Sequence, residues 1–493
     1  MKKIRKHYRL EQDALGTKRV PNDAYTGIFY SRAKENFSLS TRRFPQEFFH
    51  QLAIIKRVSA EEHVKLKQLD EEVGKAIARA TREVEKGTFD EWFDIDVYEA
   101  GAGTPLNMTM NEVISNRALE LLHERKGKYA RIHPNNHVNM GQSTNDVIPT
   151  ALRITTLLFS RELENELEKT IHETLKLSKR YSTFAKTGRT HVQAAVPVTF
   201  GQELSVYAHS LRERLETIRE AKNHLLTIPL GGTAVGTGIT TTPHYARAVV
   251  QRLARETRLP LREAPNKMLL TSHMTDFQHY SNALSELASD VQLWMNDWVL
   301  LGSDPYAGLG EIHLLEVEPG SSIMPGKINP SILEALKMIT LQVQGNHETI
   351  RLSCESTQLE LNVMTPVMGS NLFESIQLLT RGITMFREKC LVHVRATPRM
   401  SELLQKSTSV ATALNPYVGY DVVAFLVKKS LATNTLFSQL VINEGLLLPA
   451  EANVLLHPAY LTKPRKVDAA LRAAIRSRTT YQKIREHVQK YSR

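Results

Sequence analysis

The stretch TALRITTLLFSRELENELEKTIHETLKLSKRYSTFAKT, residues 150–187, decides the fold, because its 38 residues contain neither glycine nor proline. Its apolar residues, among them Leu163, Leu167 and Ile171, recur every four positions with charged residues between them, which is helical spacing. A helix of this length would extend about 57 Å, too far to bury its apolar stripe inside a small domain. We therefore expect other long helices beside it, from this chain or from further copies of it.

Two more runs lack both residues, 202–228 and 266–301, and predict further long helices. The flanking regions are shorter helices and loops. We expect a mainly α subunit in three parts, with the long helices forming an elongated central bundle that assembles with other copies into a common helical core. The parts are an N-terminal mixed, mostly helical domain (1–142), the central long-helix bundle (143–398) and a small C-terminal helical domain with a basic tail (399–493).

Composition favours an ordinary soluble globular protein, with 42% hydrophobic and 23% charged residues among 493. The two cysteines, Cys354 and Cys390, exclude a cysteine-based zinc cluster and favour a reducing compartment. Residues 1–7 are basic but have no apolar stretch behind them, so we expect no secretory signal. No run approaches the roughly 20 apolar residues of a membrane span. We expect a cytoplasmic protein with no membrane partner.

The net charge of +11 is concentrated at the end of the chain. Residues 463–493 hold ten Lys and Arg residues against Asp468 and Glu486, which leaves a local balance of +8. Only Tyr481 and Tyr491 could stack on bases there, so we interpret the tail as a solvated helix or flexible end and do not expect a nucleic-acid partner.

Four loops between the helical runs are dense in glycine and small polar residues. The first three offer hydroxyls, amides and free backbone N–H groups beside helix ends, which suits carboxylate binding. The fourth adds a lysine and two serines between glycines, so it can supply both a charge clamp and a mobile reactive hydroxyl. The loops are GAGTPLNM (101–108), GQSTND (141–146), GRTHVQ (188–193) and GSSIMPGKINP (320–330).

Each loop also has a structural interpretation when taken singly. Ser143 and Thr144 could cap the helix that follows them. His191 could be a structural histidine, and residues 320–322 could be a linker. The glycine-rich stretch 231–238 lacks the spacing of a dinucleotide or phosphate-binding fingerprint, so we expect a structural role for it.

Taken together, in their order and spacing, the four loops resemble those of the fumarase/aspartase superfamily. The 320–330 loop is similar to the superfamily signature, and 142–146 and 188–191 are similar to the aspartase and class II fumarase branch. The likeness extends from RLEQDALG (9–16) to LNP (414–416). It implies a homotetramer in which three subunits share each active site, a small dicarboxylate substrate and no cofactor or metal. Activation by Mg²⁺ occurs in some aspartases, but no residues here can be assigned to it.

The resemblance also implies roles for individual residues. Members of this branch remove a proton next to a carboxylate, which creates a doubly charged aci-carboxylate that needs preorganised donors. Ser321 corresponds to the base, and His191 to a proton carrier or orienter with Glu334 as its carboxylate partner. The expected substrate contacts are hydroxyls at the charged carboxylate (Thr104, Ser143, Thr144, Ser322), a clamp on the other carboxylate (Lys327, Asn329) and groups at the leaving amine or hydroxyl (Asn145, Thr190, His191).

The leaving group distinguishes the two activities of this branch. Ser143-Thr144 and the stretches 101–104, 362–369 and 456–460 look like those of aspartases. The stretches IHPN (132–135) and GYD (419–421) are compatible with fumarases, although Asn136 stands where an acidic residue is common at the second anion site of fumarases. We expect an aspartate ammonia-lyase, with class II fumarate hydratase as the alternative. A third hypothesis, a noncatalytic structural member, is disfavoured because the reactive residues are retained.

Overall fold

The computed structural model describes residues 7–491. The basic residues 1–6 and the last two residues of the basic tail lie outside the described part. The described chain is mainly helical, as the sequence predicts, and its strands form four separate two-stranded sheets. The strands are β1 (Tyr8–Asp13), β2 (Gly16–Pro21), β3 (Ala185–Thr190), β4 (Gln193–Thr199), β5 (Thr227–Ile228), β6 (Arg262–Glu263), β7 (Ile312–His313) and β8 (Arg395–Ala396). β5 and β6 pair in parallel, and the other pairs (β1–β2, β3–β4 and β7–β8) are antiparallel.

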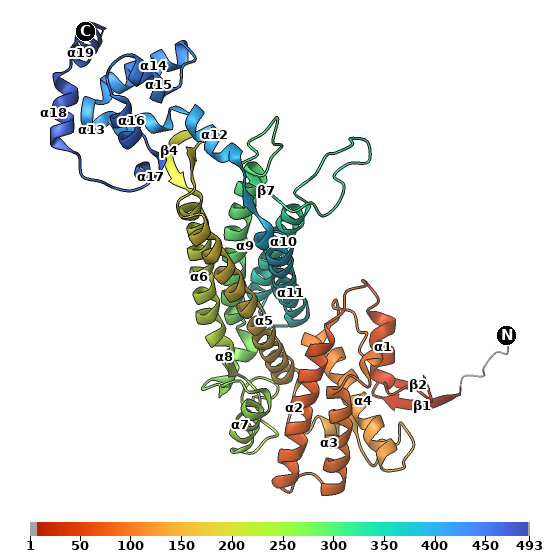
Figure 1. Ribbon diagram of the computed structural model, residues 1–493. Helices are drawn as coiled ribbons and strands as arrows, with labels where there is room; N and C mark the ends of the chain where they lie inside the picture. Colours follow the sequence, from red (N-terminus) through yellow and green to blue (C-terminus); the bar gives the residue numbers. More distant parts are fainter. Residues whose placement is uncertain (1–6, 492–493) are drawn as a thin grey trace. The chain divides into compact units, whose positions relative to one another are not determined.

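Five helices are long and the others are short (Figure 1). The long helices are α5 (Thr144–Arg180), α6 (Phe200–Leu225), α9 (Thr275–Leu301), α10 (Ser331–Glu355) and α11 (Thr365–Lys389). The helices before and between them are α1 (Ile28–Asn36), α2 (Gln46–Lys65), α3 (Glu71–Glu85), α4 (Thr104–Leu121), α7 (Tyr245–Thr257) and α8 (Lys267–Ser272). The C-terminal helices are α12 (Pro398–Lys406), α13 (Asn415–Val418), α14 (Tyr420–Ala432), α15 (Phe437–Asn443), α16 (Pro449–Leu455), α17 (Pro458–Leu461), α18 (Ala469–Ser477) and α19 (Thr479–Tyr491).

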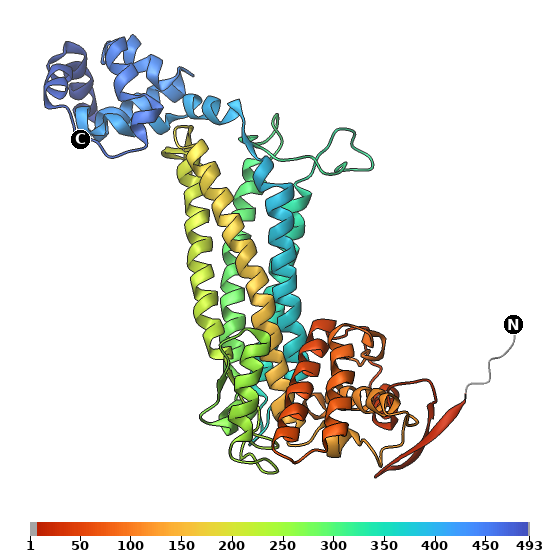
Figure 2. The ribbon, with the colours of Figure 1, turned by 60° about the horizontal axis from the view of Figure 1, so that its bottom comes forward.

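The chain divides into two compact units, and the division falls inside all five long helices. Unit 1 contains Met1–Asn165, Arg214–Ser289 and Ile339–Arg381, and unit 2 contains Glu166–Glu213, Asp290–Met338 and Gly382–Arg493. Within each unit, segments of the long helices lie side by side (Figures 1 and 2). The three-part domain division remains a prediction.

The three expected helices form, but the limits of each differ from those of its run. The first begins at Thr144, includes Pro149 in its second turn and ends at Arg180, before strand β3. The second, α6, ends at Leu225, and the last two residues of its run form strand β5. The run 266–301 is divided between α8 and α9. Asn266 caps α8 by accepting a hydrogen bond from the Leu269 N–H at 3.2 Å.

Aromatic side chains form much of the core of each unit. In unit 1, Phe48 on α2 lies against Phe49 and Phe373, and all three are almost fully buried. In unit 2, Trp294 on α9 stacks on Tyr207 of α6 with ring centroids 4.8 Å apart and meets Phe386 of α11 edge-on at 4.9 Å. Burial of such a side chain contributes roughly 2–3 kcal/mol, so these contacts hold α2 against α11 in unit 1 and hold α6, α9 and α11 together in unit 2.

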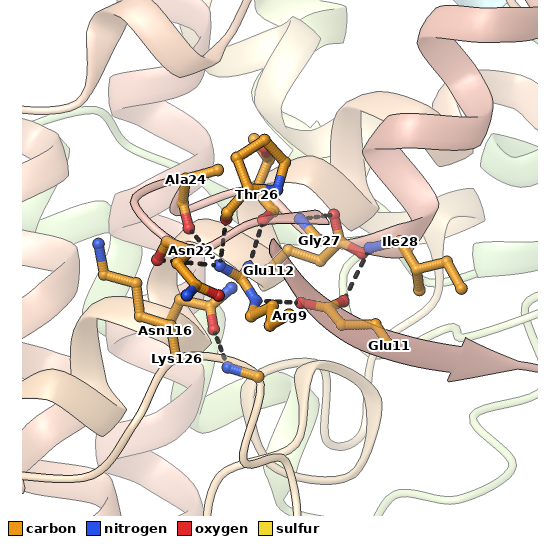
Figure 3. A network of polar contacts seen from close by, with 12 residues as sticks. Arg9, Glu11, Asn22, Ala24, Thr26, Gly27, Ile28, Glu112, Asn116 and Lys126 are labelled. Atoms are coloured by element: carbon orange, nitrogen blue, oxygen red, sulfur yellow. Dashed lines mark hydrogen bonds and ion pairs between the residues drawn. The ribbon is translucent and has the colours of Figure 1, made fainter. Parts of the chain in front are cut away.

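The β1–β2 hairpin is fastened to the rest of unit 1 by the buried side chain of Arg9 (Figure 3). Its guanidinium donates to the carbonyl oxygens of Ala24 at 3.0 Å and Thr26 at 2.7 Å, and to the Glu11 carboxylate at 2.7 Å. Planar guanidinium donors suit several acceptors at once, so one side chain fixes the path of the chain from β1 to α1.

Two buried carboxylates hold the N-terminus of α1 (Figure 3). Glu11 accepts from the Ile28 N–H, and Glu112 accepts from the Gly27 N–H, both at 2.8 Å. A side chain at position 27 would place its Cβ 2.7 Å from Glu112 and 2.8 Å from Glu11, so only glycine fits there. The free N–H groups and dipole of the helix stabilise the two acidic groups at this end.

The basic tail forms helices α18 and α19 as far as the structure describes it. Ile475, Tyr481 and Ile484 are buried in a core cluster of the C-terminal region, while the charged residues between them are largely exposed. Arg478 pairs with Glu451 at 2.5 Å. These contacts agree with the interpretation of the tail as a solvated helix. No helix in the described part of the chain is long and apolar enough to cross a membrane.

Candidate active site

The expected site residues fall into two groups, one in each unit. Unit 1 holds the residues of the first two loops, namely Thr104, Ser143, Thr144 and Asn145. Unit 2 holds the residues of the hairpin and of the fourth loop, namely Thr190, His191, Ser321, Ser322, Lys327, Asn329 and Glu334.

In unit 1, the 101–104 loop brings the Thr104 hydroxyl to that of Thr144. Gly101, Ala102 and Gly103 all adopt positive φ angles (71°, 56° and 95°), which turns the chain sharply before α4 begins. Thr104 Oγ1 donates to the Gly101 carbonyl at 2.6 Å and lies 3.3 Å from Thr144 Oγ1. Two hydroxyls from separate loops are thereby paired, which is an arrangement suited to bind one carboxylate.

The start of α5 positions the other two polar residues of this group. The Ser143 Oγ accepts from the Asn145 N–H at 3.2 Å, so Ser143 caps the N-terminus of α5 in the chain without substrate. Asn145 Nδ2 donates to the Ala234 carbonyl at 2.7 Å, which ties this turn to the glycine-rich stretch 231–238.

Asp146 secures the same stretch and was not among the predicted site residues. Its Oδ1 accepts from the Ser143 N–H at 2.9 Å, and its Oδ2 accepts from the N–H groups of Gly231 at 3.0 Å and Thr233 at 2.9 Å. Burial raises the pKa of Asp146 to about 6, although these backbone donors favour the charged form. The glycine-rich stretch therefore has a structural role in the described chain, as the sequence predicts.

Sequence reasoning also missed two buried polar residues next to the hydroxyl pair. Asn107 on α4 donates from Nδ2 to Thr144 Oγ1 at 3.2 Å. Lys56 on α2 donates to Asn107 Oδ1 at 2.6 Å and has no solvent exposure. Lys56 lies four residues after Leu52 and three before Ser59, on a buried face of α2, but its local sequence pattern is the same whether the lysine is solvated or buried.

In unit 2, Thr190 and His191 lie at the tip of the β3–β4 hairpin. Thr190 pairs with Gln193, which leaves His191 and Val192 as a two-residue turn with φ angles of 54° and 62°. This is the type I′ geometry, in which asparagine and glycine are preferred. A β-branched valine at such a φ angle is strained, so the hairpin holds the exposed His191 imidazole at a local cost in stability.

A buried ion cluster fixes the base of this hairpin. Glu311 has no solvent exposure, and its carboxylate contacts Arg189 at 2.6 Å and Lys186 at 3.2 Å. Lys186 also contacts Glu203 of α6 at 2.6 Å. Burial raises the pKa of Glu203, and the Lys186 cation opposes that rise. The hairpin that carries Thr190 is therefore tied to α6 and to the segment before β7.

The fourth loop is closed at its base and exposed at its tip. The Gly320 N–H donates to the Lys327 carbonyl at 2.8 Å, and Asn329 Nδ2 donates to the Gly320 carbonyl at 2.9 Å. Lys327 and Ser322 are exposed between these contacts. Glu334 follows in the first turn of α10 and is also exposed.

The Ser321 hydroxyl has the most specific surroundings in this loop. Its Oγ accepts from the N–H groups of Ile323 at 3.2 Å and Met324 at 3.1 Å. Two backbone donors aimed at one oxygen stabilise negative charge on that oxygen. The arrangement can therefore favour an alkoxide-like serine that abstracts a proton.

Comparisons with known proteins identify the family of the chain. A family described as "Lyase" matches residues 16–345, and one described as "Fumarase C C-terminus" matches residues 410–463. The chain belongs to the fumarase/aspartase superfamily of lyases.

Curated relatives of the chain carry two kinds of name. It is 39% identical to the aspartate ammonia-lyase of Bacillus subtilis (strain 168), over 93% of this chain and 97% of that protein. It is also 39% identical to a class II fumarate hydratase of Bradyrhizobium diazoefficiens, over 92% and 97% of the two chains.

Among solved structures, the chain is similar to a fumarate lyase:delta crystallin from Brucella melitensis in its cobalt-bound form. The TM-score is 0.90 and the identity 39%, over 93% of this chain and 100% of that one. A class II fumarase from Schistosoma mansoni gives a TM-score of 0.88 at 33% identity, with the same coverage. The mainly α fold of this superfamily is thereby confirmed.

Proposed function

We propose that the chain is an aspartate ammonia-lyase, which eliminates ammonia reversibly from L-aspartate to give fumarate. The observation that carries this proposal is the Ser321 hydroxyl, whose oxygen accepts two backbone N–H groups. A serine that acts as a general base needs its negatively charged oxygen stabilised, and the two N–H donors support that role for Ser321.

In the proposed reaction, Ser321 acts as the alkoxide, its own proton having passed to solvent, and its Oγ takes the proton from the carbon next to one carboxylate of the substrate. The electron pair moves into that carboxylate, which becomes a dianion. Four hydroxyls donate to it, those of Thr104, Ser143, Thr144 and Ser322, and the Thr104 hydroxyl turns to it from the Gly101 carbonyl, to which it donates in the chain without substrate. The electron pair then returns from the carboxylate to form the carbon–carbon double bond of fumarate. The carbon–nitrogen bond breaks at the same time, and ammonia leaves with the electrons of that bond. Donors already in position stabilise the dianion more than the substrate, which accelerates the step.

The remaining residues would position the substrate. Lys327 and Asn329 would clamp the second carboxylate through its charge and oxygen atoms. Asn145, Thr190 and His191 would contact the amine, with His191 carrying or orienting the departing proton. Glu334 would orient the His191 imidazole through a carboxylate–histidine contact.

We further propose a homotetramer in which three copies of the chain contribute to each site. Support comes from unit 2, where three large apolar side chains on the long helices are exposed. Val206 is 63% exposed, Leu293 63% and Met338 65%. Exposed apolar side chains along helices are typical of surfaces that associate. A cytoplasmic location is supported by the free, buried thiols of Cys354 and Cys390.

Class II fumarate hydratase is the second candidate, because relatives named for both activities match the chain equally well. The two reactions share the dianion and differ in the group that leaves. The aspartase-like residues Ser143-Thr144 and the stretch 101–104 favour ammonia.

The experiment measures fumarate formation by its ultraviolet absorbance, with L-aspartate and with L-malate in separate reactions. Turnover of L-aspartate supports the proposal, turnover of L-malate alone assigns the hydratase, and no turnover of either supports a noncatalytic member. Ser321→Ala should abolish turnover and leave the oligomer intact, whereas Ser38→Ala, at an exposed serine of unit 1, should match the wild type. Substantial activity in Ser321→Ala would show that the base is misassigned.

A further inference from the structure

Lys56 is the most deeply buried cation next to the hydroxyl pair of unit 1, and its surroundings are polar. It lies on α2 with no solvent exposure. Its Nζ donates to Asn107 Oδ1 at 2.6 Å and to Asn139 Oδ1 at 2.8 Å. An ammonium group has three donors and no acceptor, so both amides must turn their oxygen atoms toward it.

This contact fixes the direction of the next hydrogen bonds. With its oxygen on Lys56, Asn107 must present Nδ2 on the other side, where it lies 3.2 Å from Thr144 Oγ1 and 3.3 Å from Asn139 Oδ1. The amide donates, so the Thr144 oxygen accepts. The hydrogen of the Thr144 hydroxyl is then free to be donated to a ligand.

The neighbouring hydroxyl completes the arrangement. Thr104 Oγ1 donates to the Gly101 carbonyl at 2.6 Å, and its oxygen lies 3.3 Å from that of Thr144. The amide donor from Asn107 occupies a lone pair of the Thr144 oxygen, so the Thr144 hydrogen points away from Asn107 and is left for Thr104 Oγ1 or for a bound ligand.

The charge of Lys56 also favours a carboxylate bound at Thr144. Burial lowers its pKa to about 7, and attraction to the buried Asp146 carboxylate opposes this decrease. Tyr245, also buried, faces Asp146 from α7. A carboxylate bound at Thr144 adds negative charge nearby and favours the charged lysine.

We propose that Lys56 is a positioning residue for the elimination: through Asn107 it orients the Thr144 hydroxyl as a donor, and its charge stabilises the carboxylate that becomes the dianion. This inference rests on the proposed function, but it applies to ammonia and water elimination alike, because both pass through the same dianion. Lys56 itself need not touch the substrate.

The test uses Lys56→Met, which keeps the length of the side chain and removes its charge. The interaction between the unit charge of Lys56 and the dianion, across the Asn107 and Thr144 side chains and at an effective dielectric constant of about 20, corresponds to about 10- to 30-fold in rate. We expect kcat to fall by that factor, measured per active site, while KM changes less than about threefold. The matched control is Lys65→Met on the same helix, where the side chain is 60% exposed; it should leave both constants unchanged.

Two further measurements keep the inference testable if Lys56→Met folds poorly or if turnover is absent. Asn107→Leu removes the amide and keeps Lys56, and it should lower kcat in the same way. Binding is compared for succinate, a dicarboxylate, and for 3-nitropropionate, whose nitronate form places two negatively charged oxygens on one planar group, as the dianion does. Lys56→Met should weaken the nitro acid about 10-fold or more and succinate less than about threefold. Equal effects on the two ligands, or unchanged kcat in both folded variants, would overturn the inference.

Discussion

The buried ion cluster at the base of the β3–β4 hairpin gives a prediction whose size follows from its contacts. Glu311→Gln keeps the shape of the side chain and removes its charge. Arg189 then loses its carboxylate partner, and Lys186 keeps only that of Glu203. Removal of one partner from a buried ion pair costs about 3–5 kcal/mol. Arg189 is 16% exposed and Lys186 keeps Glu203, so we expect the lower end of that range, about 3 kcal/mol.

The assay is thermal unfolding of the variant and the wild type at the same scan rate. For 493 residues the unfolding entropy is about 1 kcal/mol/K, so the expected loss lowers Tm by about 3 °C. The hairpin also carries Thr190, so KM should rise as well. The control is Glu348→Gln, because Glu348 forms an exposed pair with Arg351 and its loss should leave Tm unchanged. A Tm within about 1 °C of wild type with unchanged KM would refute the reasoning.

Two other substitutions test the burial of the Glu99 carboxylate and the backbone strain of the hairpin turn at Val192. Burial raises the pKa of Glu99 to about 9, and both its carboxylate oxygens are buried without a hydrogen-bond partner. The folded chain therefore keeps a proton that the unfolded chain loses above its usual pKa of 4.5, so stability falls as pH rises from there toward 9. Glu99→Gln should raise Tm at about pH 8 and not at about pH 4; an equal Tm gain at both would contradict this assignment. Val192→Gly should stabilise the chain by about 1 kcal/mol, because glycine adopts the positive φ without strain; a loss of stability in urea unfolding would show that the turn is not strained.

The search for runs without glycine or proline predicted three of the five long helices of the described chain, because such a run with apolar residues at helical spacing has few other solutions; it missed α10 and α11, which contain Gly345 and Gly369. The same pattern failed at the limits of the helices, where local interactions decide whether the chain continues as a helix. Pro149 was treated as a boundary, yet α5 begins before it, and the segment 181–187 leaves the helix to form strand β3. The β3–β4 hairpin has no glycine at its turn, so its usual signal is absent.

The candidate residues could be predicted from loops that share small polar residues, and the structure brings Thr104 and Thr144 together as expected for one carboxylate site. Lys56 and Asp146 were missed for a physical reason. Their importance depends on burial and on partners distant in the sequence, and a lysine between apolar residues of a helix has the same local pattern whether it is solvated or buried.

The central proposal is that Ser321 of one copy and Asn145 of another act in one site of the proposed homotetramer. The direct test mixes two inactive variants, Ser321→Ala and Asn145→Ala, in equal amounts after unfolding and refolds them together. Each residue is then wild type in half of the chains, so about a quarter of the sites receive both intact residues and activity should return to about a quarter of wild type. Ser321→Ala mixed with Lys327→Ala is the control, because one loop of one chain supplies both residues and no activity should return. Recovery in neither mixture, with both variants forming mixed tetramers, would contradict the claim.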